Sequence, residues 1–192
     1  MTHGAGVARD YLQRGMASLR CLVVCSSFFP AKGTSMGIAL TVRQYLEQNA
    51  IDYEVLPHHR TTSSLATAHA AHVPAGSLAK SVILEDEAGF LMAVVPANCR
   101  LELGQVHRLL KRALGLATEE TVAALFQDCE TGAVPALGDA YGMEMLVDDS
   151  LVGQPEIYFE GGNHRELLHM PNREFRRLLT SAQRGHISHP IA

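Results

Sequence analysis

Two apolar runs separated by a short linker constrain the fold of this chain most strongly. Residues 80–84 and 90–95 are rich in branched side chains, and the five residues between them, 85–89, end in Gly89. Apolar runs joined by a short link that contains glycine are typical of a β-hairpin. The sequence therefore predicts a pair of antiparallel strands near the middle of the chain.

Helices and shorter strands are predicted on both sides of this hairpin. Helical spacing of apolar residues, with capping residues at Ser63 or Ser64, Thr118 and Asn172, predicts helices over 38–49, 63–72, 103–114, 118–126 and 172–179. Short apolar runs predict further strands over 53–56, 143–147, 157–159 and 167–170. Because helices and strands do not alternate regularly, the pattern favours a mixed α/β or α+β domain over a doubly wound sheet.

One domain with two irregular ends is the expected organisation. A chain of 192 residues that is 47% hydrophobic can bury a single core. We expect residues 1–35 to be a poorly ordered extension, 36–183 to be the domain and 184–192 to be a frayed tail. The apolar run 19–29 has the outline of a signal peptide, but it is too short to span a membrane and no clean cleavage site follows it. We therefore predict no membrane partner, and a native start at Met36.

The charge of the chain restricts the nucleic acids that it can bind. The formal net charge is −4, and the chain has no tryptophan and few other aromatic residues. A general DNA or RNA binder needs clustered lysine and arginine, and a base-stacking platform needs aromatic side chains. DNA is therefore excluded as an expected partner, and any contact with RNA should be local.

Neither cysteine nor histidine forms a recognisable metal or nucleophile motif. The four cysteines, which include Cys99 and Cys129, form no C-x-x-C pair, and we predict reduced thiols in a cytoplasmic protein. Asp128 and Glu130 flank Cys129, and two anions should raise its pKa and disfavour a thiolate nucleophile. The ten histidines lack an H-E-x-x-H pattern or an acid-rich ligand set. We therefore predict no metal and no cofactor.

One lysine and one loop are the strongest candidates for chemistry. Lys80 precedes the first run of the hairpin, so its stem should be buried and its ammonium exposed. This arrangement is usual for a lysine at a strand end; the functional alternative is an ammonium that contacts a phosphate or a carbonyl oxygen. The loop 128–138 contains glycine and proline, and Glu130 within it is either solvated or orients water. Asp148 either caps a turn or belongs to the site.

These segments resemble, in their order, the YbaK family of aminoacyl-tRNA editing domains. The lysine lies in Leu78-Ala79-Lys80-Ser81-Val82-Ile83-Leu84, and a partner strand ends in Ala93-Val94-Val95-Pro96. The loop Gly132-Ala133-Val134-Pro135-Ala136-Leu137-Gly138, the strand Met145-Leu146-Val147-Asp148 and the turn Glu160-Gly161-Gly162-Asn163 follow. The resemblance covers roughly 38–179. In one departure, Pro135 lies three residues after Gly132, whereas the family often has a spacing of four or two successive prolines; Ala136 fills the next place.

The resemblance implies a fold, an activity and a set of site residues. It implies a single α+β domain with a mixed, mostly antiparallel sheet or half-barrel surrounded by helices. It implies hydrolysis of the ester between an amino acid and the 3′-terminal ribose of a mischarged tRNA, without a cofactor. Lys80 would anchor the terminal adenosine or its phosphates, and Gly132 and Pro135 would position the carbonyl. The implied substrate-binding residues are Ser81, Ala133, Val134, Glu130, Asp148, Gly161, Gly162 and His164.

Other functions stay open at this point. The departure at Ala136 is compatible with a binding module that holds tRNA ends, or docks on an aminoacyl-tRNA synthetase, without turnover. The histidine count alone suggests a third alternative, a metal-dependent hydrolase.

Overall fold

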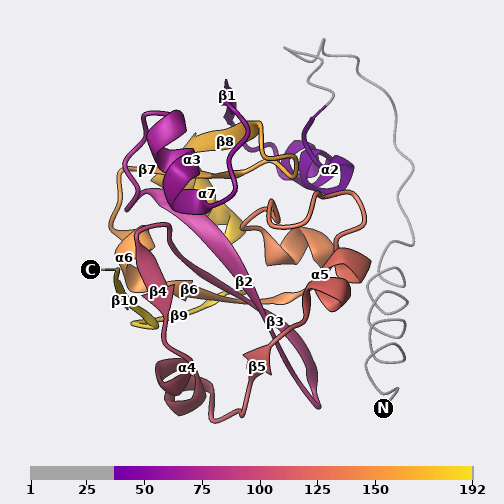
Figure 1. The fold of residues 1–192 in the computed structure, drawn as a ribbon, viewed down its shortest axis with the longest axis vertical. Helices are drawn as coiled ribbons and strands as arrows, with labels where there is room; N and C mark the ends of the chain where they lie inside the picture. Colours follow the sequence, from indigo (N-terminus) through magenta and orange to yellow (C-terminus); the bar gives the residue numbers. More distant parts are fainter. Residues whose placement is uncertain (1–36, 192) are drawn as a thin grey trace.

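The computed structural model describes residues 37–191, which form six helices, ten strands and one short 3-10 helix (Figure 1). The helices are α2 (Leu40–Gln48), α3 (Ser64–Ala70), α4 (Leu103–Leu110), α5 (Glu119–Leu125), α6 (Asp149–Val152) and α7 (Asn172–Leu178), and the 3-10 helix is η1 (Gly138–Tyr141). The strands are β1 (Glu54–Pro57), β2 (Leu78–Asp86), β3 (Gly89–Pro96), β4 (Cys99–Leu101), β5 (Gly115–Leu116), β6 (Glu144–Asp148), β7 (Glu156–Glu160), β8 (Glu166–Pro171), β9 (Gln183–Gly185) and β10 (Ser188–Pro190). The predicted extension 1–35 and the predicted start at Met36 lie outside the described residues.

Eight strands form one sheet in the order β1-β8-β7-β2-β3-β6-β9, with β5 paired to β2 beside this path. The pairs β1–β8, β7–β8, β2–β3 and β2–β5 are antiparallel, whereas β2–β7, β3–β6 and β6–β9 are parallel. A separate two-stranded sheet joins β4 and β10. The sheet does not close into a barrel, and the predicted α+β fold with a mixed, mostly antiparallel sheet is confirmed.

The predicted hairpin is the centre of the sheet. Strands β2 and β3 pair over eight positions, with Lys80 opposite Val95 and Ser81 opposite Val94. The linker turns at Gly89, whose φ of 131° is a conformation that residues with a side chain rarely adopt. Every residue of β3 is buried, as expected for a strand covered on both faces.

One edge of β2 has a gap in its pairing. On the side away from β3, β7 pairs with Leu78 and Ala79, and β5 pairs with Leu84 and Glu85. No strand of the described part of the chain pairs with residues 80–82 on this side. The two neighbours diverge here, which leaves backbone groups of β2 without a ladder partner.

Helices cover both faces of the sheet, and side chains alternate between two cores. Ala79 and Ile83 belong to a large core with residues of α2, α5 and α7. Leu84 and Val95 face the other way, toward Val106 of α4. Because successive strand residues point to opposite faces, Lys80 and Ser81 must also point to opposite faces.

The structure differs from two sequence expectations near the C-terminus. The tail expected to fray, 184–192, contains β10 and most of β9, and Ile187 between these strands is fully buried. The prediction that Asn172 caps α7 is wrong, because Pro171 occupies the cap position and makes no side-chain cap bond. The Asn172 amide instead donates to the carbonyl oxygens of Leu151, at 2.9 Å, and Gln154, at 2.5 Å. Among residues 37–191, no helix has the length and apolar character needed to cross a bilayer.

Candidate functional site

The Lys80 ammonium is half-buried and bound by backbone oxygens. Its Nζ donates to the carbonyl oxygen of Cys99 at 2.6 Å and contacts that of Ala97 at 3.4 Å. Burial lowers the pKa of Lys80 below its usual value, and the nearby charge of Arg100 lowers it further. No carboxylate of the described residues forms an ion pair with Lys80. Backbone carbonyl dipoles therefore orient the ammonium, and no acidic side chain of the described residues neutralises its charge.

Ser81 connects β2 to the predicted loop on the opposite face. Its hydroxyl donates to the Val134 carbonyl oxygen at 2.7 Å. The loop is packed tightly, because Ala133 and Ala136 are fully buried and Pro135 is buried as well. Ala136, the position that departs from the family pattern, therefore fills a place in the large core.

The gap in β2 lies between the lysine and this loop. The carbonyl oxygens of Ser77 and Ile83 accept hydrogen bonds from Tyr158 and Ala117, on the side of β7 and β5. Because backbone groups point to alternate edges of a strand, the N–H and C=O of Ser81 point toward the same edge. Lys80 and the loop thus lie on opposite faces of the sheet but meet at one unpaired stretch of backbone.

The glycine turn after β7 supports the loop from beneath. The His164 ring is buried, and its Nε2 donates to the Thr131 carbonyl oxygen at 2.8 Å. The next residue, Gly132, has a φ of 86°, and a side chain there would meet the His164 ring at 3.4 Å. The Glu130 N–H donates to the Gly162 carbonyl oxygen at 2.7 Å. The structure therefore brings Glu130, Gly132, Gly162 and His164 close together.

The first residue of this turn is a buried acid that is not among the site residues implied by the resemblance. Glu160, the last residue of β7, is buried and accepts a hydrogen bond from the Thr67 hydroxyl at 3.0 Å. Its second oxygen lies 3.8 Å from Nε2 of His58, whose side chain is fully buried. Burial raises the pKa of Glu160 above its usual value. His58 and Glu160 are about a hundred positions apart in the sequence, so no local pattern links them. The only sequence signals for a site were that His58 follows Pro57 in a loop and that Glu160 precedes a Gly-Gly turn.

Asp148 binds the scaffold instead of facing the gap. One of its oxygens accepts hydrogen bonds from the N–H and hydroxyl of Ser150, and the other accepts them from the Ile187 N–H at 3.0 Å and the Ser188 hydroxyl at 2.8 Å. Although burial acts to raise it, the pKa of Asp148 is lowered by these hydrogen bonds. The structure thus fits the alternative in which Asp148 caps a turn, here the start of α6.

Cys129 is poorly suited to act as a nucleophile. Burial is the main cause that raises its thiol pKa to about 12, and the charge of Asp128 acts in the same direction. Its sulfur lies 3.3 Å from the Tyr141 hydroxyl. Within residues 37–191 no group of three or more histidine, cysteine or acidic side chains is placed to hold a metal ion.

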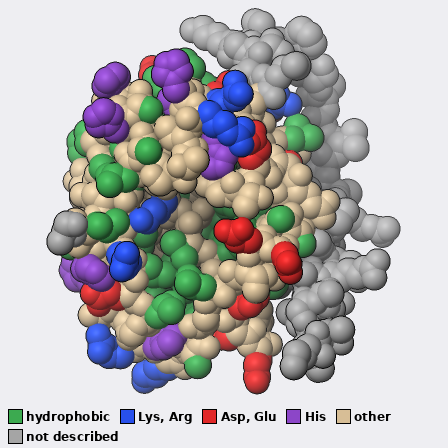
Figure 2. All heavy atoms as spheres, in the orientation of Figure 1, with side chains coloured by type: hydrophobic (Ala, Val, Ile, Leu, Met, Phe, Trp, Pro, Cys, Tyr) green, Lys and Arg blue, Asp and Glu red, His purple; other side chains and the backbone are tan. Residues whose placement is uncertain are grey.

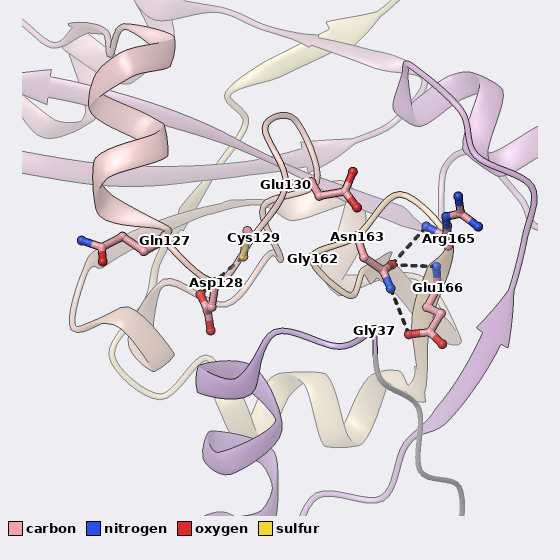
Figure 3. Close-up of a pocket in the computed structure, with 9 residues that line it drawn as sticks. All are labelled: Gly37, Gln127, Asp128, Cys129, Glu130, Gly162, Asn163, Arg165 and Glu166. Carbon is pink, nitrogen blue, oxygen red and sulfur yellow. Dashed lines mark hydrogen bonds between the residues drawn. The ribbon is translucent and has the colours of Figure 1, made fainter.

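A cleft of about 640 Å³ lies beside the glycine turn (Figure 3). It is lined by Gly37, Gln127, Asp128, Cys129, Glu130, Gly162, Asn163, Arg165 and Glu166. Of the predicted site residues, only Glu130 and Gly162 take part. Three carboxylates and a single arginine line this cleft, so its charge disfavours binding of a phosphate. We therefore place the candidate site at the gap in β2. Figure 2 shows a hollow with an apolar floor at the centre of the face in view.

Comparisons with known proteins identify the family of the chain. Residues 58–178 match the model of the aminoacyl-tRNA editing domain. This match spans more than half of the chain, and the chain therefore belongs to the aminoacyl-tRNA editing domain family. A search of curated proteins finds no significant relative.

Solved structures share the fold. A crystal structure provisionally assigned as a trans-editing enzyme for prolyl tRNA synthetase is 29% identical, with a TM-score of 0.67 over 79% of this chain and 96% of that one. A scaffold protein from epitope-grafting work is 25% identical, with a TM-score of 0.65 over 80% of this chain and 97% of that one. A hypothetical protein is 24% identical, with a TM-score of 0.68 over 78% and 99%, and shows the fold alone.

Proposed function

We propose that this chain is a free-standing aminoacyl-tRNA deacylase that hydrolyses the ester of mischarged tRNA. One observation carries the proposal. The Lys80 ammonium, which contacts only carbonyl oxygens among the described residues, lies beside an unpaired stretch of β2 that a glycine and proline loop adjoins through Ser81. A cation next to free backbone donors suits a substrate with both a phosphate and an ester carbonyl.

The residues at the gap divide the work of binding. Lys80 supplies positive charge for the terminal adenosine or its phosphate. The Ser81 N–H, which points to the open edge, is a donor for the carbonyl oxygen of the ester. Gly132 and Val134 form one wall for the amino acid, with Ala133 and Pro135 packed behind them. Glu130, Gly161, Gly162 and His164 hold that wall in place. Asp148 acts from a distance. It accepts hydrogen bonds from Ile187 and Ser188, and β10 pairs with β4, whose Cys99 carbonyl oxygen accepts from Lys80.

The proposed reaction needs no nucleophile from the protein. Water adds to the ester carbonyl carbon, the bond from that carbon to the ribose oxygen breaks, and the proton from water passes to that oxygen. The products are a free amino acid and a tRNA with a free terminal hydroxyl. Because the ester is already activated, positioning of the water, helped by the neighbouring ribose hydroxyl, supplies much of the rate. The protonated thiol of Cys129 is compatible with this route.

Release of amino acid from mischarged tRNA, measured with a chelator present, tests the proposal. Lys80→Ala should slow release about ten- to a hundred-fold, since a charge-assisted contact is lost. Its unfolding temperature should change little, because the ammonium has no buried carboxylate partner in residues 37–191. Lys80→Arg should restore little activity, because a planar fork does not fit the place of a point charge.

Three outcomes would contradict the proposal in different ways. A folded Lys80→Ala protein with the wild-type rate would remove Lys80 from the site. Binding of charged tRNA without release would identify a binding module, for tRNA ends or as a partner of a synthetase. A rate that the chelator abolishes would indicate a metal-dependent hydrolase. A panel of mischarged tRNAs then identifies the amino acid.

A further inference from the structure

Lys80 has a second cation as its neighbour. Its Nζ bonds to the carbonyl oxygen of Cys99, and the next residue along β4 is Arg100. Cys99 is buried and Arg100 is exposed, so this strand directs the arginine outward. No carboxylate of residues 37–191 pairs with either cation. The charge of Arg100 acts on Lys80, and two cations without a counterion attract an anionic ligand.

The strand that carries Arg100 is held firmly by the C-terminal segment. Strand β10 pairs with β4, and His189 lies opposite Arg100. Backbone bonds on both sides extend this pairing, from Glu102 to Ile187 and from Ile191 to Asn98, each at 2.8 Å. The β4–β10 pair is therefore a preorganised platform, which reduces the entropy lost when a ligand binds.

The charges around the hollow are distributed unevenly. Figure 2 shows lysine, arginine and histidine side chains between the hollow and the C-terminal end, on the side where Figure 1 places β4 and β10. Acidic side chains lie on the other side of the hollow. Glu102, at the end of this strand pair, already pairs through its carboxylate with His189 at 2.8 Å. A polyanion that enters the hollow would be attracted from the β4–β10 side.

We propose that Arg100 and the β4–β10 pair form a docking surface for the phosphate backbone of the RNA strand that leads into the site. The terminal phosphate would contact Lys80, and the phosphate before it would contact Arg100. His189 would add a further hydrogen bond at the outer end. This inference rests on the proposed function, which sets the direction in which the RNA strand enters. Arg100 lies within the family match of 58–178, whereas His189 of β10 lies outside it.

Binding of uncharged tRNA, titrated against salt, tests this surface. Arg100→Gln should weaken binding about ten- to a hundred-fold at low salt. The slope of log affinity against log salt should shrink by about 0.7, the value for one single-stranded phosphate contact. Arg100→Lys, which keeps the charge, should retain the wild-type slope. Free inorganic phosphate should compete only weakly, because it lacks the linked phosphates that span both cations.

Arg176→Gln is the matched control. Arg176 is also exposed and unpaired among the described residues, but it lies on α7, whose packed side chains belong to the core on the other face of the sheet. Its slope should equal that of the wild-type protein.

The failure of this inference can be separated from the failure of the proposed function. If the wild-type protein releases amino acid but Arg100→Gln keeps the wild-type slope, the docking surface is refuted and the deacylase stands. If no amino acid is released but the slope still drops in Arg100→Gln, the surface stands without the reaction. Equal competition by inorganic phosphate and by RNA would reduce the surface to a simple anion site and overturn the proposal.

Discussion

The buried pair of Glu160 and His58 allows a sharp prediction about stability. Nδ1 of His58 lies 2.8 Å from the His59 carbonyl oxygen, so this nitrogen must carry a proton. Nε2 of a neutral ring is then an acceptor, and it faces an oxygen of Glu160 at 3.8 Å. Neither atom has a hydrogen-bond partner among the described residues. Two buried acceptors cannot face each other without cost, and a proton on Glu160 removes that cost, in line with its raised pKa.

The two substitutions Glu160→Ala and Glu160→Gln should differ strongly. Alanine removes the carboxylate that faces Nε2 of His58 and accepts from the Thr67 hydroxyl, and it opens a cavity, which should lower the free energy of unfolding by about 3 kcal/mol. Glutamine can donate its amide to His58 and accept from Thr67, so its loss should stay below about 1 kcal/mol. Chemical denaturation at several pH values, followed by circular dichroism, measures both.

The pH dependence follows from the raised pKa of Glu160. The folded protein holds this proton more tightly than the unfolded chain. The stability from this proton is complete below the usual glutamate value of 4.5 and is lost as pH rises through the raised value. Glu160→Gln should not show this loss. A glutamine variant as unstable as the alanine variant, with the wild-type pH slope, would show that Glu160 does not hold this proton in the folded protein.

Three further predictions follow from the scaffold and the charge of the chain. Asp148→Asn should lower the free energy of unfolding by about 3 kcal/mol, because amide hydrogens would face the donors of Ser150, Ile187 and Ser188. Since the pKa of Asp148 is lowered in the fold, its contribution exists above the usual value of 3.8 and is lost as pH falls through the lowered value; an acid titration of the two proteins that runs in parallel would contradict this. Cys129, with a pKa of about 12, should resist alkylation by iodoacetamide at pH 7 in the folded protein, which mass spectrometry can check against the denatured chain; rapid labelling of the folded form would show an exposed thiolate. A short acceptor-stem mimic that carries the amino acid should be hydrolysed nearly as well as full tRNA, and duplex DNA should not bind at physiological salt, because a chain of net charge −4 neutralises few phosphates; tight binding to DNA would reveal a larger basic surface.

The sequence by itself determined the central hairpin, the longer helices and the family. Apolar periodicity located the hairpin, and the capping predictions at Ser63 and Thr118 are confirmed by bonds from the Ala66 and Thr121 N–H groups. These signals are local, because a helix cap or a strand alternation depends on residues only a few positions apart. The order of the loop and turn motifs, likewise readable along the chain, indicated the editing-domain family that the comparisons then showed.

The tertiary structure decided how these segments combine into a site. The opposite faces of Lys80 and Ser81 follow from strand alternation, but the open edge beside them exists only because β7 and β5 diverge along β2. The Glu160–His58 pair and the β4–β10 platform each join residues about ninety or more positions apart. Such contacts are set by the packing of the whole sheet and its helices, and no local sequence pattern encodes them.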